Sequence, residues 1–432
     1  MSLPQQTTVL IVGAGPCGMA AALSLNHQGI HDIVIVDALL AGENSSRAMV
    51  IQAATLEVRR HYFVECVHST TSTVSTAFLS VGNKVETLGL HDGPSYLLST
   101  DFSLLSPYTK FPFALGIPQT KTEAGMLEKL DQLGIKVWRP FKVVSLKPSQ
   151  DEGRSFEVRF ESGDIIKARF AAKLELRSRI PMATNSTIME TFPSWPSATW
   201  HLPPPPQFAI PNQGVSITVS DGNFTLFARF PAKASPDKTR PVYRIACSVP
   251  VADGTAPHAP SAEYLQSLLD RVGPPALSSD PGINPHPTRI DHVYWSSRYR
   301  TRSAIADGYF APTPNGTGAV LLIGDAAHIH SPIGGQGMSL GIRDAISLGP
   351  VLKAHIVESG ANNKLFEDWA SSRRQRALSV IALTKETMRI ITAPQKIWSP
   401  FVTLGFAVLR FFGKFNFVKR MVAYRLSGLA EI

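Results

Sequence analysis

Two glycine-bearing segments far apart in the sequence carry the residues best suited to hold a phosphate-containing molecule. The first follows the apolar run 9–12 and reads Gly13-Ala14-Gly15-Pro16-Cys17-Gly18, with an apolar helical pattern directly behind it. Gly13 permits a tight turn, Gly15 lets backbone N–H groups approach a pyrophosphate, and Gly18 lets helix and strand pack closely. The helix N-terminus adds positive potential. This segment therefore predicts a dinucleotide-binding turn.

An acidic residue stands near the spacing that such a turn requires. The apolar run 33–36 predicts a second strand and ends at Asp37, close to the roughly 20-residue separation expected of a carboxylate that binds an adenosine ribose. We therefore expect Asp37 to bind the same ligand as the glycine turn.

The second segment begins where another buried strand ends. The run 320–323 is apolar and is followed by Gly324 and Asp325. A carboxylate at that strand end can hold ribityl or ribose hydroxyls. We therefore expect Gly324 and Asp325 to bind the cofactor from the opposite side.

A glycine-rich turn and a helix follow at once. Pro332, Gly334 and Gly335 disfavour a helix interior, whereas a helical pattern begins at Gly337 and Met338. The N-terminus of that helix would face an electron-rich ring. The two segments together predict one nucleotide-cofactor site, and their pairing indicates a flavin.

These residues also carry a family resemblance that extends over almost the whole chain. The sequence resembles the class A flavoprotein monooxygenases, the aromatic hydroxylases related to para-hydroxybenzoate hydroxylase and phenol hydroxylase. The matching marks are the first glycine turn, Ser46-Arg47-Ala48, Thr55-Leu56-Glu57, Asp101-Phe102-Ser103, Pro118-Gln119 with Thr122-Glu123, Trp295 to Tyr299, and Gly324 to Ala345.

The resemblance implies both a cofactor and a reaction. Arg47, Gln119 and Asp325 match positions that line FAD in such enzymes, so they are expected to bind it here. NADH or NADPH would reduce FAD, O2 would form a flavin C4a-hydroperoxide, and a phenolic or other aromatic substrate, including polyketide-like ones, would be hydroxylated. Pro332, Gly334 and Gly335 would shape the space beside the reactive carbon, and they are the expected catalytic positions.

The expected fold is α/β, with a Rossmann-like FAD-binding lobe interleaved with a smaller, mostly antiparallel substrate-binding sheet and a helical C-terminal tail. Residues 1–180 are expected to form the first part of the FAD lobe and residues 181–305 the substrate sheet. Residues 306–390 would return to the FAD lobe, and residues 391–432 would form the tail. Relatives that continue into a thioredoxin-like domain are longer, and we expect no such module here.

Composition narrows the class further. The chain has 432 residues, 44% of them hydrophobic, and three cysteines with neither disulfide nor metal spacing. We therefore expect a cytoplasmic enzyme without a metal site or a secretion signal. The net charge of +9 is spread along the chain, which argues against nucleic-acid binding and favours mild attraction of anionic ligands.

The C-terminal region leaves one partner open. The uncharged run 397–409 is too short to span a bilayer. Cations interleaved with phenylalanines after it allow peripheral membrane contact, although a packed helical tail is the favoured interpretation. The sequence does not define the oligomeric state.

Departures from the family pattern keep other functions in view. A glycine-aspartate-glycine turn usually precedes the arginine-serine pair, but the stretch 171–176 replaces it before Arg177-Ser178 with residues that favour helix. Ala54 replaces a common arginine and Ser339 a common asparagine. The alternatives are another flavin oxidoreductase on the same scaffold (an epoxidase, a halogenase or a reductase) or a degenerate, non-catalytic flavin-binding protein. His328 and His330 are expected to be structural rather than catalytic acids or bases.

Overall fold

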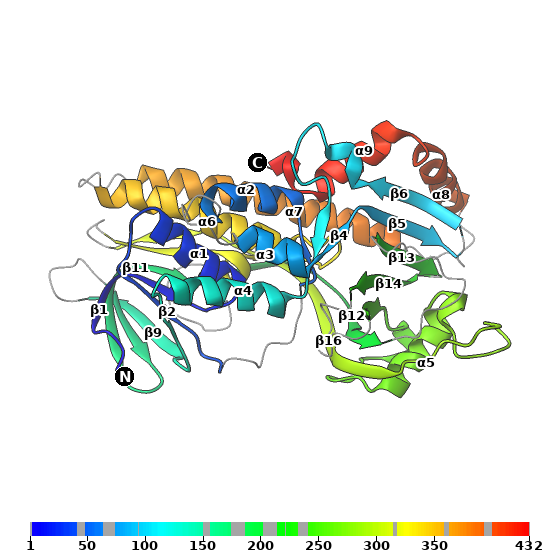
Figure 1. The fold of residues 1–432 in the computed structure, drawn as a ribbon, viewed down its shortest axis with the longest axis horizontal. Helices are drawn as coiled ribbons and strands as arrows, with labels where there is room; N and C mark the ends of the chain where they lie inside the picture. Colours follow the sequence, from blue (N-terminus) through cyan, green and yellow to red (C-terminus); the bar gives the residue numbers. More distant parts are fainter. Residues whose placement is uncertain are drawn as a thin grey trace.

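The computed structural model describes residues 2–40, 48–63, 74–93, 95–149, 156–173, 186–201, 214–220, 222–231, 241–313, 318–357, 363–392 and 400–431. Two large sheets lie side by side, and two long helices run along the molecule above them (Figure 1). The fold is the α/β type expected from the sequence.

The first sheet is built around parallel strands. Its order is β17-β18-β11-β1-β2-β8, and β9 and β10 continue from β11. The bounds are β1 Gln6–Val12, β2 Ile33–Val36, β8 Val137–Trp138, β9 Val143–Pro148, β10 Phe156–Phe160, β11 Ile165–Lys173, β17 Phe310–Pro312 and β18 Ala319–Leu322. Strands β10 and β11 form an antiparallel hairpin. Strand β11 also continues as a central strand between β1 and β18.

Helices cover one face of this sheet. They are α1 Pro16–His27, α2 Ala53–Phe63, α3 Val74–Val81, α4 Gln119–Gln132, α6 Gly337–Val357 and α7 Lys364–Ile391. Residues of α1, α4, α6 and α7 share one large apolar core with the sheet, whereas the opposite face packs against β9 and β10. Burial on both faces explains why strands β1 and β18 read as continuous apolar runs.

Alanine and glycine bring α1 and α6 unusually close. A Cβ built on Gly349 of α6 would lie 2.3 Å from the Ser24 hydroxyl of α1, and that hydroxyl donates a 2.8 Å hydrogen bond to the Ile346 carbonyl. A larger residue at Gly349 would separate the helices. This contact joins the two ends of the sequence in one lobe.

The second sheet is mostly antiparallel, with order β19-β16-β12-β15-β14-β13-β5-β6. Its strands are β5 Thr87–Asp92, β6 Ser95–Asp101, β12 Ser186–His201, β13 Gly214–Ser220, β14 Asn223–Phe230, β15 Val242–Cys247, β16 His292–Ala306 and β19 His328–Ile329. Two of these strands, β5 and β6, come from residues that the sequence analysis assigns to the first part of the FAD lobe. The longest pairing in this sheet joins β16 to β12, from His292 with His201 to Ala306 with Ser186.

Smaller elements complete the fold. A third sheet has β7 (Ala114–Gly116) between β3 (Val50–Ile51) and β4 (Asn83–Val85). Helix α5 (Ala262–Val272) covers the face of the second sheet that carries Phe227 and Tyr243. Helices α8 (Pro400–Phe412) and α9 (Asn416–Leu426) lie beside β5 and β6 (Figure 1). Among the described residues, none of the helices has both the length and the apolar character needed to cross a bilayer.

Candidate cofactor and substrate site

The turn after β1 has the shape that its glycines predict. Gly13 has φ of +110°, a conformation that side-chain-bearing residues rarely adopt, and its N–H donates to the Val36 carbonyl at 2.7 Å. Gly15 is different, because its φ is −76° and no other described atom lies within 4 Å of a Cβ built there. The glycine at 15 therefore leaves open space directly above the N-terminus of α1, where Gly18 is buried.

Asp37 holds this turn in place. Its carboxylate accepts hydrogen bonds from the N–H groups of Ala14 (2.6 Å) and Leu39 (2.8 Å). The guanidinium of Arg139 donates to the Ala14 carbonyl at 3.1 Å and lies 3.7 Å from the Asp37 carboxylate. A carboxylate has about four lone-pair sites, so Asp37 keeps capacity for a ribose hydroxyl. Sequence reasoning did not identify Arg139, which lies far along the chain.

The two glycine segments meet at one edge of the parallel sheet. Val12 of β1 is in register with Lys173 of β11, and Lys173 is in register with Leu322 of β18. Strands are about 4.8 Å apart, so the segments that follow β1 and β18 leave the sheet roughly 10 Å from each other. The carboxyl end of such a sheet is where nucleotide ligands bind.

A glycine in α6 confirms this proximity. A Cβ built on Gly341 would lie 2.5 Å from the Cys17 sulfur and 2.9 Å from the Gly324 Cα. Both glycine segments therefore touch the same point of α6. Gly324 has φ of +58°, and Asp325 is exposed although residues 324 and 326–328 are buried. Asp325 thus projects from the strand end toward the outside of the protein core.

The turn 332–335 is held by a side chain that the sequence analysis missed. Gly334 and Gly335 have φ of +88° and +62°, and the N–H of Gly335 donates to the Pro332 carbonyl at 2.9 Å. The buried amide of Gln52 donates to the Gly334 carbonyl at 2.7 Å. Its own backbone N–H donates to the Ser339 hydroxyl at 3.1 Å. Gln52 therefore ties the segment after Arg47 to the second glycine turn.

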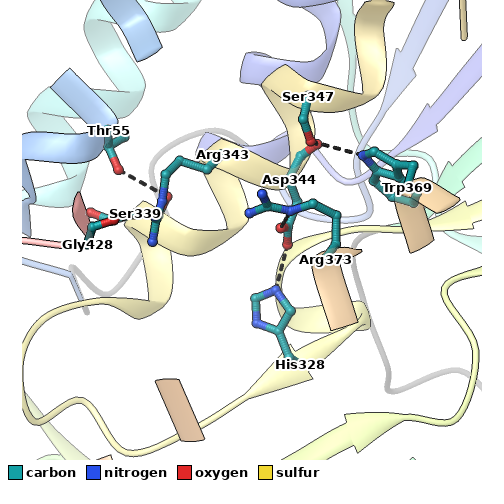
Figure 2. A network of polar contacts seen from close by, with 9 residues as sticks. All are labelled: Thr55, His328, Ser339, Arg343, Asp344, Ser347, Trp369, Arg373 and Gly428. Carbon is teal, nitrogen blue, oxygen red and sulfur yellow. Dashed lines mark hydrogen bonds and ion pairs between the residues drawn. The ribbon is translucent and has the colours of Figure 1, made fainter. Parts of the chain in front are cut away.

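Ser339, one of the departures from the family pattern, holds the second glycine turn through two hydrogen bonds. Its hydroxyl accepts from the Gln52 N–H, and its carbonyl accepts a 3.2 Å hydrogen bond from the Thr55 hydroxyl (Figure 2). Ala54, where an arginine is common, is buried among Phe102, Leu105 and neighbouring apolar residues. Gly337 and Met338, directly before Ser339, are the first residues of α6. The replacements are thus accommodated without leaving the turn unsupported.

Gln119 also connects distant parts of this site. Its side-chain oxygen accepts from the Ala48 N–H at 3.0 Å, while its own N–H donates to the Ala48 carbonyl at 3.0 Å. Its amide nitrogen donates to Glu123 at 2.8 Å. Gln119 therefore fixes the backbone next to Arg47. Arg47 itself lies outside the described residues, as do residues 174–185.

A buried network of charged and polar side chains, His328, Asp344 and Arg373, links the second glycine segment to α6 and α7 (Figure 2). Asp344 of α6 lies 2.6 Å from the His328 ring nitrogen and 2.7 Å from the Arg373 guanidinium. Burial alone would raise the pKa of Asp344, but the adjacent Arg373 and His328 hold it below its ordinary value. The structural role expected for His328 is confirmed, because its ring joins β19 to α6 and α7.

His330 is buried beside the glycine turn. Its Nδ1 lies 2.8 Å from the Ser331 carbonyl, so Nδ1 carries the hydrogen and Nε2 is an acceptor. Burial lowers the pKa of His330 to about 4, which keeps the ring neutral at physiological pH. A neutral, buried ring agrees with the expected packing role.

The second sheet turns one face toward these cofactor segments. Phe230 and Val242 pack against Met49 and Tyr294, and Ile333 of the glycine turn packs with Ile217 and other residues of this sheet. The sheet therefore contacts both the segment after Arg47 and the turn 332–335.

One cation lies on that face. Arg244 pairs in register with Ala228, which packs near Met49 and Val50, and its guanidinium lies 4.3 Å from the centre of the Trp295 ring. Burial lowers the pKa of Arg244 to about 9. A register shift in β16 beside Trp295 places Tyr294 and Trp295 on the same face. Arg298, also a sequence candidate, instead donates to the Ala256 carbonyl at 3.0 Å.

Comparison with known proteins agrees with this geometry. The family model described as "FAD binding domain" matches residues 6–172 and 285–384, so the chain belongs to that family. Rifampicin monooxygenase of Rhodococcus hoagii is 27% identical, over 89% of this chain and 71% of the relative. Anhydrotetracycline monooxygenase of Streptomyces rimosus is 27% identical, over 87% of this chain and 68% of the relative.

Solved structures show the same fold. The p-nitrophenol 4-monooxygenase of Pseudomonas putida DLL-E4 superposes with a TM-score of 0.74 at 19% identity and covers 99% of both chains. The anhydrotetracycline hydroxylase of Streptomyces rimosus gives a TM-score of 0.70 at 23% identity, over 98% of this chain and 76% of the other.

The residues present fit FAD. Open space faces Gly15, and the side-chain oxygens of buried Gln52 and Gln336 have no hydrogen-bond partner among the described residues. Buried acceptors without a donor are rare unless a ligand or water supplies one. In the described part of the chain, no group of three or more His, Cys, Asp or Glu side chains could hold a metal ion. The chain is an FAD-dependent monooxygenase, an oxidoreductase that uses NAD(P)H.

Proposed function

We propose that the chain hydroxylates a phenolic or polyketide-like aromatic compound held between the second sheet and the turn 332–335. The observation that carries this proposal is the contact between the two regions. Ile333 of the turn belongs to the same apolar cluster as Ile217 and Phe224 of the sheet. A ring bound beside this contact would lie next to the cofactor.

The chain supplies binding, orientation and exclusion of water. When bound, FAD accepts reducing equivalents from NAD(P)H and activates O2, and one oxygen atom enters the substrate. The proposed binding residues at its nucleotide end are Gly13, Gly15, Gly18 and Asp37. Those at the middle of the molecule are Arg47, Gln119, Gly324 and Asp325. Pro332, Gly334 and Gly335 would border the reacting ring, with Gly337 and Met338 presenting the N-terminus of α6 to it.

Arg244 would favour substrates that carry a negative charge. A buried guanidinium is stabilised by a nearby anion, so a phenolate or carboxylate on the substrate would gain more here than a neutral group. Phe230, Tyr294 and Trp295 provide aromatic surface around it. The proposed substrate is therefore an aromatic ring bearing an ionisable oxygen.

The test is a panel of phenols and hydroxylated polycyclic aromatics incubated with purified protein, FAD and NAD(P)H. We expect substrate to accelerate NAD(P)H oxidation and the product to gain one oxygen atom from labelled O2. A product that gains two hydrogens or a halogen would identify a reductase or a halogenase on the same scaffold. An oxygen added across a double bond would identify an epoxidase.

A second candidate is a flavin-binding protein without catalysis. It is favoured by the carboxyl end of the central strand β11. Lys173 lies there between the strands that lead into the two glycine segments, and the sequence that follows lacks the acidic glycine turn of the family pattern. Ala171 and Ala172, which the sequence analysis interpreted as helix-favouring, are buried strand residues. Yellow protein that neither oxidises NAD(P)H nor forms product with any substrate of the panel would support this candidate.

The proposed compartment is the cytoplasm, where NAD(P)H is available. Burial raises the pKa of the Cys247 thiol to about 12, so that thiol has little reactivity. Cell fractionation with a tagged chain tests the location. Recovery only in a secreted fraction would contradict the proposal.

A further inference from the structure

The two C-terminal helices expose an unusual number of aromatic rings. Phe411 and Phe412 of α8, Phe415 of the connecting turn and Phe417 of α9 are 57%, 46%, 42% and 57% exposed. Their rings contact one another, with neighbouring centroids 5.3–6.3 Å apart. Scattered exposed apolar residues need no explanation, but a contiguous patch indicates an interaction surface.

The patch extends along one side of α8. Leu404 and Val408 are 61% and 46% exposed, and the spacing 404, 408, 411, 412 and 415 follows the helical period. The opposite side of α8 is already occupied. Phe406 and Leu409 pack with residues of β6 and α7, and Gly413 lies so close to β6 that a Cβ there would be 3.0 Å from the Leu97 carbonyl. Helices α8 and α9 lie as a pair on the outside of β5 and β6 (Figure 1), and the exposed rings belong to the solvent-facing side of that pair.

The charges that α8 and α9 themselves carry are all of one sign. Between residues 400 and 430 the sequence has five cations and no Asp or Glu: Arg410, Lys414, Lys419, Arg420 and Arg425. Arg410 lies 2.6 Å from the Asp92 carboxylate. Lys414 and Arg420 are exposed beside the phenylalanines.

We propose that α8 and α9 dock the protein on an anionic bilayer surface, with the four phenylalanine rings inserted at the headgroup boundary and Lys414 and Arg420 contacting lipid phosphates. Aromatic and aliphatic side chains on one face with cations around them are typical of interfacial helices. Long cationic side chains reach the headgroups while their stems lie along apolar surface. Helix α8 has 13 residues, too few to span the hydrocarbon core.

Charge favours a bilayer over a second copy of the chain. A two-fold contact through this patch would place the cations of one copy against those of its partner, and like charges across an interface are repulsive. An anionic bilayer offers opposite charge to the same residues. This docking is independent of the proposed substrate, because none of these residues belongs to the cofactor or substrate site.

The experiment measures flotation of the FAD-bound protein with vesicles of phosphatidylcholine alone and with phosphatidylserine added. We expect binding to the anionic vesicles that weakens as salt increases. The triple variant Phe411→Ser/Phe415→Ser/Phe417→Ser should lose binding to both kinds of vesicle. Lys414→Glu/Arg420→Glu should bind anionic vesicles at least about 25-fold more weakly, from a factor of about five for each cation lost, because the new carboxylates are also repelled.

Matched controls lie elsewhere on the surface. Ile283→Ser removes another exposed apolar side chain, 49% exposed, and Lys147→Glu reverses an exposed cation on β9. Both should bind vesicles like the unaltered protein. Flavin content and thermal midpoint, measured for every variant, show that folding is retained.

Three results would overturn the proposal. The first is flotation that is equal for neutral and anionic vesicles and independent of salt. The second is unchanged flotation of either α8–α9 variant. The third is absence of vesicle binding together with a dimer that the phenylalanine substitutions convert to monomer, which would identify a second copy as the occupant.

Discussion

The FAD-binding lobe and the second sheet border the same site, but they present different chemistry to it. In the lobe, glycines at positive φ turn the backbone toward a ligand, and the Asp37 carboxylate accepts a hydrogen bond from the Ala14 N–H directly after Gly13. In the sheet, the facing surface that the structure describes consists of aliphatic and aromatic side chains together with the buried guanidinium of Arg244. The lobe is thus suited to a fixed cofactor, and the sheet to a substrate that varies between relatives.

The largest expected effect tests the support behind the lobe. Asp344→Asn removes the charge between His328 and Arg373 and leaves the Arg373 guanidinium buried without its anion. We expect the free energy of unfolding to fall by about 3–5 kcal/mol, measured by denaturant titration. Adding Arg373→Met to the same chain should recover part of that loss, because the unpaired cation is removed. Equal free energies of unfolding for Asp344→Asn and the unaltered protein would show that the charge network does not stabilise the fold.

The next prediction concerns pH and the turn beside the sheet. The pKa of His330 is about 4 in the folded protein, compared with an ordinary value of 6.5. Between pH 4 and pH 6.5, His330 is therefore protonated in the unfolded chain and neutral in the folded protein. Stability should therefore be full above pH 6.5 and decrease as pH falls toward 4, by up to about 3 kcal/mol. Thermal melts from pH 7.5 to 4 check this, and His330→Asn should flatten the profile. A profile that is identical for both proteins contradicts the burial of a neutral ring.

The third prediction compares two glycines in helices, Gly341 in α6, which contacts both glycine segments, and Gly405 in α8, which contacts neither. Gly341→Ala would drive a methyl group against Cys17 and Gly324, and we expect about 1–3 kcal/mol of destabilisation with weaker FAD retention. The control is Gly405→Ala in α8, where no described atom lies within 4 Å of the new Cβ. It should stabilise the protein by about 0.5–1 kcal/mol. If both substitutions behave alike, the close approach at Gly341 is wrong.

The smallest expected effect lies in the sheet. Arg244→Lys keeps a cation but loses the planar group above Trp295, so KM for an acidic phenol should rise about tenfold while flavin content stays unchanged. Arg244→Met should raise it further for acidic substrates and leave neutral aromatics little affected. Steady-state kinetics with paired substrates give the answer. Equal changes for acidic and neutral substrates would mean that Arg244 only supports the sheet.

The sequence predicted the lobe better than the sheet, for a physical reason. Turns such as Gly13 to Gly18 encode their geometry locally, and Gly13 has the positive φ that such a turn requires. The membership of β5 and β6 in the second sheet depends on pairing with β13, which no local pattern reports. Gln52 and Arg139 were missed because their roles come from partners far along the chain.

The most direct test of one shared flavin site uses Gly15. Its φ allows alanine and its Cβ position is open, so Gly15→Ala should leave the thermal midpoint of the FAD-free protein unchanged. The methyl group would occupy the space that a pyrophosphate needs, and FAD should bind roughly 10–100-fold more weakly, as expected when hydrogen bonds to a charged group are lost. The measurement is FAD affinity by fluorescence quenching. An affinity equal to that of the unaltered protein would contradict a cofactor held by this turn.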